Sequence, residues 1–191
     1  SGDIIVSFDN GKRANLWHTD IYHRVRKVLG YMPQEAYLSN ASLAVNVGLH
    51  SDYAKGDVLD AIRFAELEAD IQHWETGIEA EVGETGVNLS GGQKQRVNLA
   101  RALHSGRRYL VLDDPLSAVD ATTESALMNT LLARTDGFLL SSHRLTELHR
   151  VDRLLVLDAG QLVEDGPPGE LISNSSSEFA KHLAAAEVED V

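Results

Sequence analysis

Short apolar runs alternate along the chain with segments in which apolar residues recur every three to four positions. The runs predict strands at residues 27–32, 108–112, 137–141 and 153–157. Residues 109–112 and 154–157 are apolar at every position, as parallel strands are when helices cover both of their faces. The last run turns at residues 158–160 into residues 161–164, which predicts a hairpin. This alternation is typical of an α/β domain with a parallel sheet.

Helices are predicted between and after these strands. Residues 57–69 carry apolar side chains at helical spacing, and a second helix is expected from about Ser90 to Leu103. Because no strand is evident between residues 41 and 103, this region predicts a helical insertion in the α/β core. The other expected elements are an antiparallel pair at residues 4–6 and 15–17 around an Asn10-Gly11 turn, a helix at 123–133 and a short C-terminal helix within 174–191.

The composition excludes several classes of protein. The chain has 191 residues, of which 43% are hydrophobic, enough to bury one core. With 17 basic and 29 acidic residues the formal net charge is −12, and so acidic a surface disfavours binding to nucleic acids and anionic lipids. The chain has no cysteine, which excludes disulfides and thiolate chemistry. Its apolar runs fall well short of the ~20 residues of a membrane span, so we expect a soluble chain.

The strongest local motif is Leu-Ser-Gly-Gly-Gln at residues 89–93. Ser90 and Gln93 have the spacing of a capping box, which by itself starts a helix. The box does not explain Gly91 and Gly92, because each glycine costs a helix about 1 kcal/mol relative to alanine. Glycines let a ligand approach the backbone, and free N–H groups at a helix start bind anions. The motif therefore favours a phosphate-binding helix start.

Two carboxylates follow the predicted strand at residues 108–112. Asp113 and Asp114 are expected at the carboxyl edge of a parallel sheet, where ligands bind in α/β proteins. One of them is suited to hold Mg²⁺, directly or through water, while the other is suited to orient an attacking water. The alternative is that Asp-Asp-Pro only ends the strand and caps the next element.

Three further side chains are weak signals when each is taken alone. Gln34 follows the predicted strand at 27–32, where it either reaches a metal or a water or is a surface residue in a loop. His143 follows the strand at 137–141, although a lone histidine is more often structural. Asp120 either belongs to a site or is only the N-cap of the following helix.

Together these residues fall in the order and spacing of ATP-binding cassette (ABC) ATPases. The chain resembles the nucleotide-binding domain of an ABC transporter over essentially its whole length, and residues 89–93 are identical to the family signature. Residues 30–34 resemble the Q-loop, 109–114 the Walker B strand and 117–120 the D-loop, while His143 resembles the switch histidine. The resemblance implies a P-loop NTPase-like α/β fold with a helical subdomain that carries the signature.

The resemblance implies ATP and Mg²⁺ as cofactors and gives roles to the residues near them. Asp113 is expected to hold Mg²⁺ through water, and Gln34 to sense the metal and the attacking water. Asp114 is expected to be the general base, and His143 to contact the γ-phosphate. The family usually carries Glu where Asp114 stands, and the shorter side chain sets the carboxylate back from the water. We therefore expect a degenerate site that hydrolyses ATP slowly.

The resemblance also implies a second nucleotide-binding domain as a partner. In this family two domains pair head to tail, so Ser90, Gly91, Gly92 and Gln93 are expected to bind the partner's γ-phosphate. Asp120 is expected to communicate across the dimer. Because an intact signature accompanies a degenerate base, we expect the partner to be a non-identical domain that carries the usual Glu.

Two segments narrow the type of protein. Residues 81–86 and 113–120 resemble exporter-type, multidrug-resistance-associated domains, which meet transmembrane domains. Soluble relatives in chromosome maintenance and DNA repair insert long coiled coils between Q-loop and signature, and the 54 residues at 35–88 exclude them. We expect ATP-driven export, with this domain cytoplasmic and peripheral to the membrane through its transmembrane partners. The alternatives are a soluble ABC ATPase that acts on ribosomes and a non-catalytic interaction module that bears the signature.

The chain also departs from the family in holding no G-x-x-x-x-G-K-[ST] motif. We expect an N-terminally truncated cassette that lacks roughly 50–60 residues with the P-loop, and hence little ATP binding or ATPase activity in isolation. Exposed strand edges are then expected to favour self-association. The expected division is 1–34 for the first part of the core, 35–106 for the helical subdomain, 107–172 for the rest of the core and 173–191 for the tail.

Overall fold

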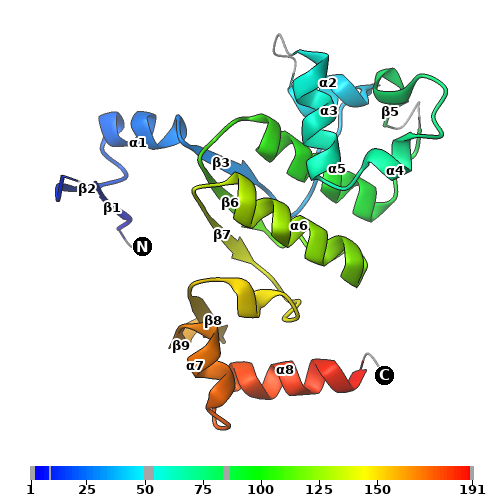
Figure 1. Ribbon diagram of the computed structural model, residues 1–191. Helices are drawn as coiled ribbons and strands as arrows, with labels where there is room; N and C mark the ends of the chain where they lie inside the picture. Colours follow the sequence, from blue (N-terminus) through cyan, green and yellow to red (C-terminus); the bar gives the residue numbers. More distant parts are fainter. Residues whose placement is uncertain (1–2, 9, 50–53, 84–86, 190–191) are drawn as a thin grey trace. The chain divides into compact units, whose positions relative to one another are not determined.

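The computed structural model describes residues 3–8, 10–49, 54–83 and 87–189 (Figure 1). The chain divides into two compact units, Ser1–Ser141 and Ser142–Val191. The first unit contains a parallel sheet and the helices that connect its strands, and the second contains a hairpin followed by helices.

The parallel sheet of the first unit forms where the apolar runs predict it. Its strands are β3 (Leu29–Met32), β6 (Tyr109–Asp113) and β7 (Gly137–Ser141), in the order β3-β6-β7. Both pairs are parallel, and Met32 lies beside Leu112. The carboxyl ends of the strands therefore meet at one edge, which is the arrangement that an α/β ligand site requires.

One face of this sheet contributes to the core of the unit. Leu110 and Leu112 on β6 are buried, as is Met32 on β3. The opposite face carries Tyr31 and Leu139, which are 61% and 62% exposed. The expectation that both faces of residues 109–112 are covered is therefore wrong for the described residues, because side chains alternate between the two faces and only one is buried.

The region from residue 41 to 104 is largely helical, as predicted, but it differs from the prediction in two respects. The expected helix at residues 57–69 is broken, because Glu66 has a φ of 55° that a helix cannot accommodate. The expectation of no strand is also wrong, since two short strands pair across the region. Strands of two residues leave no alternation to find in the sequence. The elements are β4 (Ala41–Ser42), α2 (Leu43–Gly48), α3 (Lys55–Phe64), α4 (Glu68–Ile71), the 3-10 helix η1 (Gly77–Glu79), β5 (Glu81–Val82) and α5 (Gly91–His104).

Helix α5 is the centre of this helical region. Both α2 and α3 pack against it, and it also contacts β3 of the sheet (Figure 1). Val97, Leu99 and Ala100 of α5 are buried. The predicted helix from about Ser90 to Leu103 is confirmed within one residue. The helix that follows β6, α6 (Ala121–Arg134), is likewise confirmed.

The first residues of the chain form an antiparallel pair, as predicted, but the second strand lies at residues 13–15 instead of 15–17. Strand β1 (Ile5–Ser7) pairs with β2 (Arg13–Asn15), with Val6 opposite Ala14. The following helix, α1 (Thr19–Arg26), is an element that the hydrophobic pattern did not indicate, because none of its residues is buried.

The second unit is built on the predicted hairpin. Strand β8 (Leu154–Asp158) pairs antiparallel with β9 (Gln161–Gly166). Ala159 and Gly160 between them have φ values of 46° and 76°, the two positive angles of a tight hairpin turn. The expectation that β8 belongs to the parallel sheet is wrong for the described residues, in which its one pairing is with β9. The unit also contains the 3-10 helix η2 (Leu148–Arg150), α7 (Pro168–Ser173) and α8 (Glu178–Glu189).

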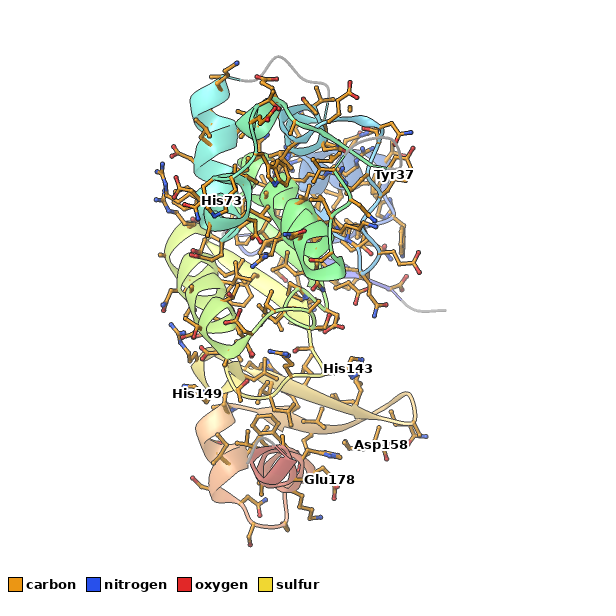
Figure 2. The ribbon with its side chains drawn as sticks, turned by 90° about the vertical axis from the view of Figure 1, so that its right-hand side faces the viewer. Tyr37, His73, His143, His149, Asp158 and Glu178 are labelled. Carbon is orange, nitrogen blue, oxygen red and sulfur yellow. The ribbon has the colours of Figure 1, made fainter. Side chains whose placement is uncertain are left out.

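A carboxylate of β9 holds the start of α8. Glu164 accepts hydrogen bonds from the Ser177 hydroxyl at 2.9 Å and from the backbone N–H groups of Glu178 at 2.7 Å and Phe179 at 3.0 Å. These donors, the Phe179 N–H above all, lower the pKa of Glu164. Figure 2 labels Glu178 at this end of the helix. The cap places Phe179 in the core of the unit.

Candidate functional site

Helix α5 begins in the way that the capping-box spacing predicts. The Ser90 hydroxyl accepts a hydrogen bond from the N–H of Gln93 at 3.2 Å, and Gln93 Oε1 accepts one from the N–H of Ser90 at 2.9 Å. The first turn of a helix has no internal acceptor for its other amides, here those of Gly91 and Gly92. The helix start therefore keeps N–H groups and the positive end of the helix dipole, which suit an anion.

The two glycines of the motif have different surroundings. A Cβ atom on Gly91 would meet no atom within 4 Å, so its backbone is open to a ligand. A Cβ atom on Gly92 would lie 2.3 Å from the backbone oxygen of Ala118. Glycine at position 92 is therefore required by a close contact inside the chain, whereas Gly91 leaves its backbone open. Phosphate binding by either residue stays a prediction.

An acidic residue of the helical region fixes the end of the motif. Asp70 on α4 accepts a hydrogen bond from the Gln93 amide at 2.9 Å and forms an ion pair with Arg96 at 2.7 Å. The Arg96 and Asp70 side chains are mostly buried, so water screens the ion pair less than it screens a surface pair. Gln93 is thereby held from two sides, by Ser90 and by Asp70.

The two carboxylates after β6 lie at the predicted edge of the sheet but in unlike environments. Asp113 is half-buried, and its Oδ1 accepts a hydrogen bond from the Ser141 hydroxyl at 2.7 Å. Asp114 is only 6% exposed, and its backbone has a φ of 51°, which is uncommon for a residue other than glycine. Its N–H donates to the backbone oxygen of Ser141 at 3.2 Å and to the hydroxyl at 3.0 Å.

One oxygen of the Asp114 carboxylate is buried without a hydrogen-bond partner among the described residues. A buried carboxylate oxygen is normally satisfied, so a water or another ligand is expected to occupy this position. The structure therefore offers a receptive oxygen next to Asp113, although it faces the interior rather than an open surface.

An open cleft of about 420 Å³ brings the Q-loop glutamine to the helix start. Gln34 is exposed there, and Lys94 adds a positive charge beside it. The cleft is lined by Gln34, Glu35, Ala36, Gly91, Lys94, Gln95, Ser117 and Ala118. Residues from three predicted motifs thus share one surface.

A larger hollow of about 720 Å³ shares Ala36 and Lys94 with this cleft. Tyr37 lines it with a side chain that is 79% exposed, and Figure 2 labels this residue. Gly83 lines it as well, with a φ of 120° and its backbone tight against Asn40. Of the exporter-like segment at 81–86, residues 84–86 lie outside the described residues.

Asp120 is the N-cap of α6, as one of its two interpretations predicts. Its carboxylate accepts hydrogen bonds from the backbone N–H of Thr123 at 3.0 Å and from the Thr123 hydroxyl at 2.9 Å. The N–H of Thr123 is the main cause of the lowered pKa of Asp120. The side chain is exposed, so this local role leaves it accessible to a partner.

His143 follows β7 and belongs to the second compact unit, where its side chain is exposed (Figure 2). The neighbouring Ser142 hydroxyl accepts a hydrogen bond from the Arg144 N–H at 3.0 Å and donates one to the Arg144 carbonyl at 2.9 Å, which shapes the turn after the strand. The switch role of His143 remains a prediction.

The residues present fit a magnesium ion only in part. Asp113 and Asp114 supply the oxygen ligands that Mg²⁺ prefers, and the unpartnered Asp114 oxygen is a receptive atom. In the described residues, however, no three His, Asp or Glu side chains converge as a metal site. A Mg²⁺ at this edge of the sheet would therefore complete its shell with water and with nucleotide oxygens.

Three polar residues of α5 that belong to none of the predicted motifs connect this helix to the turn after β6, to the Q-loop and to α2. Gln95 binds the turn after β6, Asn98 donates to the carbonyl of Pro33 at 2.7 Å, and Arg101 binds the backbone of Tyr37 and of Asn46. Burial lowers the pKa of Arg101. The signal in the sequence is the spacing of three residues, which sets Gln95, Asn98 and Arg101 on one face of the helix.

Comparison with known proteins gives one consistent answer. Residues 2–117 match the family described as ABC transporter. The probable multidrug resistance ABC transporter ATP-binding/permease protein YheI of Bacillus subtilis is 40% identical over 156 residues, which are 80% of this chain and 26% of YheI. The transport/processing ATP-binding protein ComA of Streptococcus pneumoniae is 33% identical over 161 residues, 83% of this chain and 22% of ComA. The chain thus spans about a quarter of the length of these relatives.

The fold comparison agrees with the sequence comparison. The structure of a bacterial Atm1-family ABC exporter with ATP bound matches with a TM-score of 0.78 and 30% identity, over 93% of this chain and 31% of the exporter chain. Within the described residues, none of the helices combines the length and apolar character that crossing a bilayer needs. The signature at the start of α5, the carboxylates after β6 and these matches lead to one conclusion: the chain belongs to the ABC transporter family.

Proposed function

We propose that this chain is the ATP-binding part of an ABC exporter and that it contributes its signature helix to an ATP molecule held by a second nucleotide-binding domain. The observation that carries the proposal is the start of α5. Its capping box is formed, and the open backbone of Gly91 lines a solvent-accessible cleft. A preformed row of amides binds a phosphate without having to reorganise first.

The charge at this cleft supports the proposal as well. Lys94 adds a cation to the cleft beside Gly91, in a protein whose formal net charge is −12. A cation at this position attracts the γ-phosphate of a partner's ATP.

The proposal extends to the carboxylates of this chain. Mg²⁺, when bound, would shield the phosphate charge. Asp113 is the residue proposed to hold it through water, and Gln34 is proposed to sense the metal and the attacking water. Asp114 is proposed to be a weak general base, since its side chain is one methylene shorter than that of Glu and the residue is only 6% exposed. His143 is proposed to contact the γ-phosphate, and Asp120 to communicate with the second domain.

The hollow beside Tyr37 is proposed to receive the transmembrane part of the exporter. It exposes an aromatic side chain and the backbone of Gly83, which belongs to the exporter-like segment. The proposal includes a location at the cytoplasmic membrane surface, next to membrane-spanning partners.

The test is ATP hydrolysis by the full-length protein in lipid nanodiscs, with Gly91→Asp as the variant. A Cβ atom at this position meets nothing within 4 Å, and the added carboxylate repels a phosphate, so ATP turnover is expected to fall at least about tenfold. Gly56→Asp is the matched control, because Gly56 lies near the start of α3 with equally open space around it. Turnover that stays at the wild-type level in Gly91→Asp would refute the proposal. A wild-type protein without any ATPase activity would favour the non-catalytic module.

A further inference from the structure

Gln95 makes an unusual set of contacts for a residue inside a helix. It is buried, and both ends of its amide are engaged. Nε2 donates to the backbone oxygen of Asp114 and, at 3.0 Å, to the hydroxyl of Ser117, while Oε1 accepts from the N–H of Ala118 at 3.2 Å. All three partners belong to the turn at residues 114–118 that follows β6.

A second contact joins the same two segments. Gly92 lies one helical turn before Gln95 on the same face of α5, and it touches the backbone oxygen of Ala118 so closely that no side chain fits between them. The start of α5 is thus fixed to the 114–118 turn at two points. One is a close backbone contact, and the other is a network of three hydrogen bonds.

The network also holds the strained residue of the site. Asp114 has a φ of 51°, and such a conformation persists only when the surroundings impose it. Ser141 binds the N–H of Asp114 on one side, and Gln95 binds its carbonyl oxygen on the other. An apolar side chain of the same size would fill the space of Gln95 but leave three polar groups of the turn without this partner.

We propose that Gln95 is a positioning residue that makes the signature helix start and the Asp113-Asp114 strand end move as one body. The inference rests on the proposed function and deepens it, because it connects two half-sites. Phosphate bound at the start of α5 belongs to the partner's ATP, whereas the carboxylates serve the site of this chain. Through Gln95, closure over one ATP sets the carboxylate geometry at the other.

The experiment compares ATP hydrolysis by the full-length protein and its Gln95→Met and Gln95→Glu variants. Methionine keeps the length of the side chain without its hydrogen bonds, and glutamate keeps an acceptor for Ala118 but no donor. Both variants are expected to lower kcat about tenfold or more while the KM for ATP changes less than about twofold, because positioning and not binding is lost. Gln72→Met on the exposed end of α4 is the matched control and is expected to retain wild-type kcat.

A merely structural role predicts a different result. Loss of folded protein would lower the fraction that binds ATP, so kcat is normalised to the number of ATP sites titrated in each variant. Unchanged normalised kcat in both variants, or a raised KM at constant kcat, would overturn the proposal.

Hydrogen exchange distinguishes a failure of the inference about Gln95 from a failure of the proposed function. In the full-length protein, Gln95→Met is expected to speed exchange in peptides that cover residues 114–118, and unchanged exchange there would overturn the inference. If the wild-type protein hydrolyses no ATP, the proposed function fails, whereas the exchange still reports whether Gln95 holds the turn.

Discussion

Replacing Gly92 by alanine is expected to destabilise the protein, although alanine is the better helix former. The new Cβ would lie 2.3 Å from the backbone oxygen of Ala118 and 3.4 Å from its carbonyl carbon. Normal van der Waals contact for such a pair begins near 3.4 Å, so the helix and the turn must separate by about 1 Å. The contacted atom is a backbone oxygen. Unlike the end of a flexible side chain, it cannot move away by rotating about a side-chain bond.

The expected magnitude follows from two opposing effects. Forced separation in a packed interior costs about 1–3 kcal/mol, whereas exchanging glycine for alanine gains about 0.4–1 kcal/mol through the unfolded chain. The net loss for Gly92→Ala is therefore about 1–2 kcal/mol of unfolding free energy. Gly91→Ala is the matched control, because its Cβ meets nothing within 4 Å and only the gain applies.

Equilibrium urea unfolding followed by circular dichroism measures both variants. The midpoint is expected to fall for Gly92→Ala and to rise slightly for Gly91→Ala, with the same dependence on urea in each. Equal stability of the two variants would refute the close contact between Gly92 and Ala118. The approach of a ligand, which the sequence suggested, would then be the remaining reason for a glycine at position 92.

Three further outcomes are expected. Asp70→Asn leaves the largely buried Arg96 without its carboxylate partner, so the free energy of unfolding in urea is expected to fall by about 1–2 kcal/mol. An unchanged urea midpoint would contradict this expectation. Asp114→Glu in the full-length protein is expected to raise ATP turnover, since the longer side chain reaches the attacking water; equal or lower turnover would end the degenerate-site proposal. Because the pKa of Glu164 is lowered, its cap on α8 is complete above the ordinary value of 4.5 and is lost as the pH falls through the lowered value. Circular dichroism from pH 7 to pH 2 should show a smaller loss of helix in Glu164→Gln than in the wild type, and parallel titrations would argue against the cap.

Elements whose interactions are close in sequence could be predicted from the sequence. The capping box joins Ser90 to Gln93, three residues apart, and the turn of the β8–β9 hairpin joins neighbouring residues. The apolar runs of β6 and β7 are likewise local patterns. Such features depend on spacing and residue type alone, and the structure contains them where they were expected.

Features that depend on residues distant in the sequence were not predicted. The pairing of Ala41 with Val82 and the two bonds of Asp70 join segments that are more than 20 residues apart. The break after α3 is a further case. The apolar stripe continues past Glu66 at helical spacing, but the helical conformation of the backbone ends there. The spacing of residues along the chain does not indicate which distant segments will pack against one another.

The signature motif combines both kinds of information. The sequence by itself determined that a glycine-rich helix start stands before a strand that ends in two carboxylates, and this order was enough to indicate the family. Only the tertiary structure decided that Gly91 faces open space, that Gly92 touches Ala118, and that Gln95 ties the helix to the carboxylate turn. The physical reason is range: capping and periodicity act within a few residues, whereas close packing and buried hydrogen bonds require the whole path of the chain.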